Sequence, residues 1–209
     1  MIVQWCVKGL SLRSDEAALE LLASRGGLQC SWWRAVGAIT PDGIHDRLTE
    51  MNLDRHVNHF SAPDPSTARP YGEQSPFISL SAGVVERDAA AKTNHVHRAR
   101  KTALWFGTRF GAESTAYLYV CWVLLTPRSA IEIQSVGEEI RDLNTYRRYS
   151  DFQTEGEIAA KVWVPDNQIA QCERWDLSTG ASEQYDLTWE HRNDRFAPPS
   201  LLMNIRELV

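Results

Sequence analysis

Five strand-like segments in the second half of the chain constrain the fold more than any other feature. Each is five to ten residues long, rich in β-branched and aromatic residues, and bounded by turn residues. The first half instead favours helices, at residues 15–24, 44–51 and 84–106. Because helices come early and strands late, the sequence predicts an α+β fold with a mostly antiparallel sheet. The expected strands are residues 116–125, 130–134, 157–164, 169–177 and 185–191.

Two further segments place the first half of this fold. Residues 28–36, with the sequence LQCSWWRAV, are apolar and aromatic and predict a strand that carries Arg34 near its end. Residues 77–81, FISLS, predict another short strand, after a proline-rich surface loop at residues 61–76. We expect an N-terminal helical extension at residues 1–27, and one globular domain at residues 28–209.

Composition excludes several classes of protein. The longest apolar stretch, residues 116–125, is too short to span a bilayer. The four cysteines lack the spacing of a zinc or redox motif, so no metal is expected. A net charge of -5 gives no general attraction to nucleic acid, although residues 95–101 form a local basic cluster, interpreted as a solvated helix face. The N-terminus does not resemble a secretory signal, which favours a cytoplasmic location as synthesised, with export by injection left open.

Three short patterns carry possible chemistry, and each is weak alone. They are Arg34, the Ser79-Leu80-Ser81 segment, and Glu155-Gly156-Glu157 directly before a predicted strand. Neither a GxGxxG turn nor a P-loop is present, so a Rossmann-type nucleotide site is not expected.

In this order, the three patterns resemble the cholera-toxin-like mono-ADP-ribosyltransferases, whose motifs are an arginine, Ser-Thr-Ser and Glu-x-Glu. The likeness extends to residues 114–120, STAYLYV, and to VPDNQI at residues 164–169, and covers residues 28–177. Leu80 departs from the family's threonine, and the segment at residues 84–111 is longer than usual. The resemblance implies an ADP-ribosyltransferase-like fold with a split β-sheet, NAD as substrate and no metal.

The resemblance also implies roles for individual residues. Glu157 is expected to stabilise positive charge on the ribose as nicotinamide leaves, and Glu155 to orient an arginine of the acceptor protein. Ser79 positions the catalytic glutamate, with Ser81 as support. Arg34 binds the pyrophosphate of NAD because a guanidinium offers several fixed donors, and the main chain at Ala35 binds the nicotinamide amide. An aromatic ring stacks on nicotinamide, for which the candidates are Phe77 and Tyr149.

Several alternatives stay open. Gln153-Thr154-Glu155 is a Gln-x-Glu pair of the kind found in relatives that modify guanine bases or asparagine, which would make a nucleic-acid base the acceptor. Water as acceptor would make the chain an NAD hydrolase, and a non-enzymatic nucleotide- or partner-binding protein is the alternative of another class. His56 and His59 are interpreted as structural or surface residues. Many members of the family are toxins or effectors, with an activator, immunity or carrier protein as partner.

Overall fold

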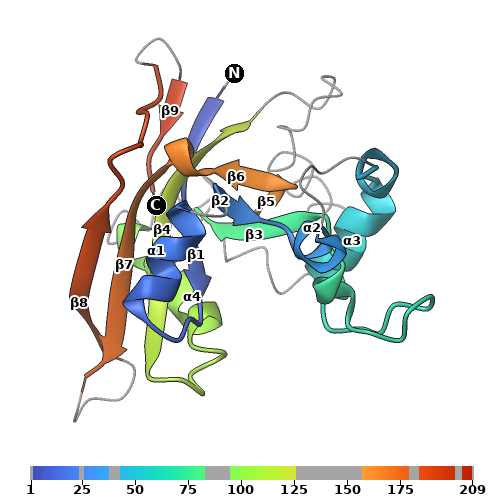
Figure 1. The fold of residues 1–209 in the computed structure, drawn as a ribbon, viewed down its shortest axis with the longest axis horizontal. Coiled ribbons are helices and arrows are strands. Elements are labelled where there is room, and N and C mark those ends of the chain that lie inside the picture. The colour runs from blue at the N-terminus through green and yellow to red at the C-terminus, as the bar shows by residue number, and fades with distance from the viewer. Residues whose placement is uncertain are drawn as a thin grey trace.

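A twisted, mostly antiparallel sheet forms the centre of the protein in the computed structural model (Figure 1). The structure describes residues 2–23, 26–37, 43–82, 95–125, 157–178, 184–200 and 204–208. The strands follow the order β5-β3-β1-β4-β7-β8, and β9 pairs with β1 in parallel. Their bounds are β1 Ile2–Leu10, β3 Phe77–Ser81, β4 Thr115–Leu125, β5 Glu157–Lys161, β7 Ile169–Leu177, β8 Tyr185–Arg192 and β9 Asn204–Arg206.

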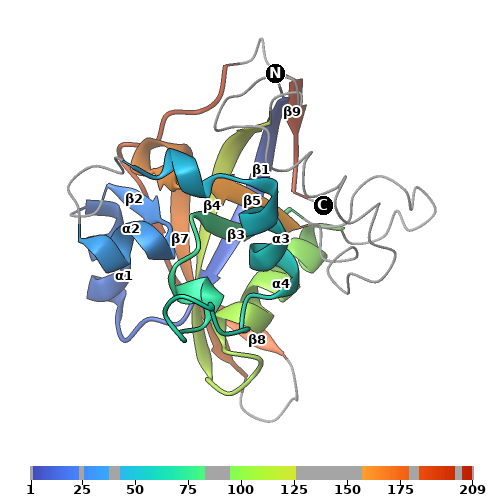
Figure 2. The ribbon, with the colours of Figure 1, turned by 90° about the vertical axis from the view of Figure 1, so that its right-hand side faces the viewer.

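Helices cover both faces of this sheet. Alternate residues of a strand point to opposite faces, so Val7 of β1 packs under α4 (His95–Gly107), whereas Cys6 packs with α1 (Asp15–Ala23) and α2 (Ser31–Val36). Figure 2 shows α1 and α2 on one side of the central strands and α4 on the other. None of the described helices is long and apolar enough to cross a membrane.

The prediction for the N-terminus was incomplete. The helix expected at residues 15–24 is α1, but residues 2–10 form β1, which pairs with β3, β4 and β9. The segment expected as an N-terminal helical extension therefore contributes a central strand of the sheet. All nine residues of β1 pair with β4, so this strand is an integral part of the sheet and not a separate extension.

A second correction concerns residues 28–36, which were expected to form one strand. Only β2 (Gly27–Gln29) is extended, and it pairs with β6 (Trp163–Pro165) in a small separate sheet. Residues Ser31–Val36 form α2, because the Cys30 sulfur accepts from the Trp33 amide at the N-terminus and Gly37, at φ 64°, ends the helix in the left-handed region.

The remaining predictions were closer. The strands expected at 77–81, 116–125, 169–177 and 185–191 are β3, β4, β7 and β8, whereas 157–164 is divided at Val162, φ 63°, into β5 and β6. The helix expected at 44–51 is replaced by the short 3-10 helix η1 (His45–Arg47) and α3 (Glu50–Asn58). Of the helix expected at 84–106, the second part is α4, whereas residues 84–94 lie outside the described residues, as do residues 130–134. Two further 3-10 turns are η2 (Tyr71–Glu73) and η4 (Asp166–Gln168).

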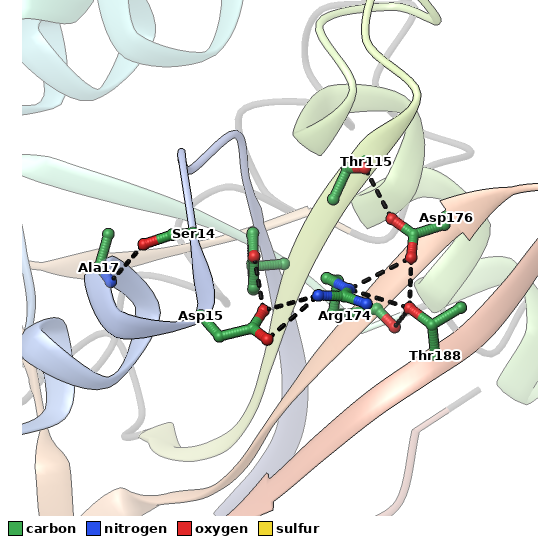
Figure 3. Close-up of polar contacts among 8 residues, drawn as sticks. Ser14, Asp15, Ala17, Thr115, Arg174, Asp176 and Thr188 are labelled. Atoms are coloured by element: carbon green, nitrogen blue, oxygen red, sulfur yellow. Dashed lines mark hydrogen bonds and ion pairs between the residues drawn. The ribbon is translucent and has the colours of Figure 1, made fainter.

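A polar network attaches α1 to the sheet (Figure 3). The Arg174 guanidinium on β7 donates to both carboxylate oxygens of Asp15, each at 3.1 Å, and to Asp176 at 3.2 Å. Asp176 also accepts from Thr115 and Thr188, so β4, β7 and β8 share one carboxylate. These contacts fix the helix that follows β1.

On the opposite face, an ion pair attaches α4 to β7. Arg100 donates to both carboxylate oxygens of Glu173, at 3.2 and 2.9 Å. Glu173 is 2% exposed and also accepts from Gln171 and Trp175. The buried carboxylate therefore has donors on several sides, as a buried charge requires.

Candidate functional site

The pairing of β3 with β5 brings two of the predicted patterns together. Ser81 lies directly opposite Glu157, and Ser79 lies opposite Ala159. Since residues two apart on a strand share a face, the side chains of Ser79, Ser81 and Glu157 project from the same side of the sheet. Glu157 begins β5 with its side chain only 11% exposed.

His56 on α3, which was expected to be a structural or surface residue, is buried and contacts this group. Its Nε2 lies 2.9 Å from the Ser79 hydroxyl and 3.7 Å from Oε1 of Glu157, and its Nδ1 lies 2.7 Å from the Ser75 hydroxyl. The His56 residue is 3% exposed. His56 therefore bridges the strand that carries Ser79 and the carboxylate of Glu157.

The His56 imidazole is neutral near pH 7. Burial, with a smaller contribution from the positive charge of Lys8, lowers the pKa of His56 to about 3. Ser75 already accepts from the Phe77 amide, so its hydroxyl can donate to Nδ1. In that tautomer the Nε2–H points at Ser79 and toward the carboxylate of Glu157, which avoids placing a nitrogen lone pair against a negative charge.

Lys8 is a buried cation in the candidate site that the sequence patterns missed. It lies on β1 on the same face as Cys6, and its charge interacts with those of Glu157 and Arg34. Burial is the main reason that the pKa of Lys8 falls to about 8, although Glu157 opposes the shift. The signal in the sequence was a single lysine near the end of an apolar run, IVQWCVKGL.

Arg34 lies near this group, but on a helix and not at a strand end. It is exposed on α2, and its guanidinium donates to the Ser31 hydroxyl at 3.1 Å. Ala35, the next residue, is also exposed on α2.

One pocket connects these side chains. Lys8, Arg34, His56 and Ser79 all line it, so it lies between β1, α2, α3 and β3. Its other lining residues are Leu10, Leu21, Leu28, Gln29, Cys30, Ser31, Phe60, Phe77 and Ile78.

Two aromatic rings belong to the pocket wall. Phe77 is only 3% exposed and lies 5.6 Å from the ring of His56, whereas Phe60 is 47% exposed and packs edge-on against the same imidazole at 5.4 Å. Phe60 was not among the predicted stacking residues, yet it is the more accessible ring. Glu155, Gln153 and Tyr149 lie outside the described residues.

The described residues include no cluster of three or more His, Cys, Asp or Glu side chains placed to hold a metal ion. The four cysteines are buried and unpaired as thiols.

Comparisons with known proteins bear on the fold. No protein-family model matches this sequence, and no curated protein matches it. The solved structure of EcPltA matches with a TM-score of 0.53 and 15% identity, over 99% of this chain and 94% of that one. A mutant of heat-labile enterotoxin (TM-score 0.44, 20% identity, 96% of this chain and 81% of that chain) and full-length CARDS toxin (0.43, 15%, 97% and 30%) are also similar.

EcPltA is an ADP-ribosyltransferase toxin. This protein combines helices with a mostly antiparallel sheet. The similarity to EcPltA extends over almost the whole of both chains. This protein therefore has the fold of the ADP-ribosyltransferase toxins.

Proposed function

We propose that this protein is an NAD-dependent mono-ADP-ribosyltransferase that releases nicotinamide and transfers ADP-ribose to a protein arginine. The observation that carries the proposal is one pocket lined by Ser79, His56 and two cations, Lys8 and Arg34. The carboxylate of Glu157 lies next to this pocket, 3.7 Å from His56, and its charge interacts with that of Lys8. The fold of known ADP-ribosyltransferase toxins supports it.

The chemistry requires stabilisation of opposite charges at two places. As the bond between nicotinamide and ribose breaks, positive charge grows on the ribose, and the carboxylate of Glu157 stabilises it. Ser79 and His56 hold that carboxylate in place through the contacts described above. The nucleophilic nitrogen of the acceptor then bonds to the ribose carbon and loses its proton. We assign Glu155 to orienting this nitrogen and accepting its proton.

The pyrophosphate of NAD needs cations, and here the site supplies two. Arg34 can present a fork of donors at the pocket edge, whereas Lys8 is a point charge deeper on β1. We assign Lys8 to the pyrophosphate together with Arg34, rather than Arg34 alone. The role of a secreted or injected toxin or effector, acting with carrier, activator or immunity partners, belongs to the same proposal.

Release of nicotinamide from NAD tests the proposal, with and without agmatine as a mimic of arginine. The wild-type protein should turn NAD over and be accelerated by agmatine, whereas Glu157→Gln should lose at least about a hundredfold in kcat. Glu190→Gln, on β8, removes a carboxylate remote from the pocket and should behave as wild type. Turnover that survives in Glu157→Gln would overturn the site.

The acceptor is tested by the same assay. Glu155→Gln should lose the acceleration by agmatine while slow hydrolysis of NAD continues. Turnover indifferent to agmatine would point to water or a nucleic-acid base as acceptor, the latter shown by labelling of guanosine or DNA.

A further inference from the structure

Three large aromatic side chains lie exposed together where α4 ends, and none of them lines the pocket of the proposed site. Trp105, Phe106 and Phe110 are 49%, 40% and 62% exposed. The ring of Phe110 packs edge-on against both others, at 5.9 Å from Trp105 and 5.4 Å from Phe106. Single exposed apolar residues are common on protein surfaces, but a contiguous group of three aromatic rings indicates a binding surface.

The cluster lies on a turn whose backbone conformation is unfavourable for residues with a side chain. Arg109 and Phe110 have φ values of 52° and 62°, in the left-handed region that residues with a side chain disfavour. Thr108 fixes the turn, since its hydroxyl donates to Leu104 O and accepts from the Gly111 amide. The Phe110 amide donates to Trp105 O at 2.7 Å. The strained turn therefore keeps the Phe110 ring at the surface.

The sequence that leads into and forms this turn is basic, although one of its arginines, Arg100, is paired with Glu173. Residues 95–112 contain three arginines and one lysine and no Asp or Glu, although the whole chain carries a net charge of -5. Lys101 is exposed one helical turn before Trp105, and the Arg109 side chain is 70% exposed. The first acidic residue, Glu113, pairs with Arg109 at 3.1 Å, a surface ion pair that leaves the cation accessible.

We propose that this aromatic turn, made of Trp105, Phe106 and Phe110 with Lys101 and Arg109, binds the surface of an anionic lipid bilayer. Aromatic rings favour the boundary between headgroups and acyl chains, and cations beside them interact with anionic headgroups. Rings packed edge-on against one another are poorly placed to receive stacked bases, which disfavours nucleic acid.

The position of the turn suits such a contact. It lies at the lower end of the molecule in Figures 1 and 2, at the end opposite the N-terminus. The Ser11 hydroxyl donates to Glu113 at 2.6 Å, so the turn is tied to the segment directly after Leu10, a residue of the proposed NAD pocket. Bilayer binding would hold the enzyme close to targets at a membrane. It can be measured without measuring NAD turnover.

Sedimentation with vesicles tests this inference. The wild-type protein should bind vesicles of phosphatidylcholine mixed with phosphatidylserine, bind pure phosphatidylcholine weakly, and dissociate in high salt. Phe110→Asn, which keeps a residue tolerant of positive φ, should lower the partition coefficient about tenfold. Lys101→Gln should lower it about fivefold, mainly on anionic vesicles.

Matched controls are available on β8. Leu187→Ser removes an apolar side chain that is 45% exposed, and Arg192→Gln removes an exposed cation; both should bind as wild type. Thermal unfolding should be unchanged in all variants. No binding of the wild type to anionic vesicles, or equal binding by Phe110→Asn, would overturn the inference. The inference would also be overturned if the wild type bound duplex DNA or RNA but not vesicles, and if Phe110→Asn lost that nucleic-acid binding.

Discussion

Lys8 combines a buried position with a charge that the proposed chemistry uses. Burial lowers its pKa to about 8, so in the folded protein the ammonium loses its proton as the pH rises through about 8. Binding of the NAD pyrophosphate should weaken over the same range, because the cation is then neutral.

We therefore expect kcat/KM for nicotinamide release to fall as the pH rises above about 8. Lys8→Arg should retain its activity at higher pH, since a guanidinium stays protonated there. Lys8→Gln should raise KM for NAD about tenfold or more at pH 7. A profile that is the same in wild type and Lys8→Arg would remove Lys8 from NAD binding.

His56 makes a prediction about stability. Its pKa is about 3 in the folded protein against 6.5 as its ordinary value, so between these pH values the unfolded chain binds more protons. The free energy of unfolding should therefore decrease as the pH falls from about 6.5, by up to about 1.4 kcal/mol per pH unit from this group.

Urea unfolding at a series of pH values measures this effect. His56→Gln has no imidazole to protonate and should show a shallower decrease between pH 6.5 and 4.5 than the wild type. The same variant should lower kcat for nicotinamide release more than it raises KM, because His56 positions Ser79 and Glu157. Parallel stability curves in the two proteins would contradict the buried, neutral state of His56.

At the scale of elements, β1 and α4 approach each other so closely that only glycine fits between them. A Cβ atom on Gly9 would lie 1.8 Å from the main-chain oxygen of Ala103 and 3.2 Å from the Gly107 amide nitrogen. The main chain of α4 would have to shift, because neither atom belongs to a flexible side chain.

Gly9→Ala should destabilise the protein by about 1–3 kcal/mol, the usual cost of overpacking. Because Gly9 follows Lys8, the same variant should also lower NAD turnover. Lys101→Ala, at an exposed position of the same helix, should change the stability by less than about 0.5 kcal/mol. Equal denaturant midpoints for Gly9→Ala and the wild type would show that α4 can move away at little cost.

Pairing of elements also explains which parts of the site were predictable. Ser79, Ser81 and Glu157 lie on short strands with clear local patterns, and their pairing followed the expected antiparallel sheet. The short aromatic segment at residues 31–36 was ambiguous between strand and helix. Its helical form depends on contacts with distant residues, such as the Trp32 amide with Ser75 O, and the Cys30 amide with Val162 O.

At the scale of the whole molecule, the sheet depends on its first strand. β1 pairs with β4 over nine residues and also pairs with β3 and β9, so it connects the strands of the proposed site to the rest of the sheet. A chain that starts at residue 11 should therefore fail to fold cooperatively, as a central strand would be missing.

Circular dichroism and thermal unfolding of that truncated chain provide the measurement. We expect the truncated chain to lose the cooperative unfolding transition. If residues 1–10 belonged to a separate extension, their removal would leave this transition intact. Addition of a synthetic peptide of residues 1–10 should restore part of the folded signal if pairing with β4 is the missing interaction.

The sequence by itself determined the fold class and the strands β3, β4, β7 and β8. These features follow from local periodicity, because a half-buried strand must alternate and a turn needs particular residues. Ser79, Ser81 and Glu157 were selected through the resemblance to a known family. The tertiary structure decided that Lys8 joins Arg34, that His56 bridges Ser79 and Glu157, and that β1 lies at the centre. These residues are far apart in the chain, and strand order and burial, which set their proximity and their pKa values, are properties of the assembled sheet.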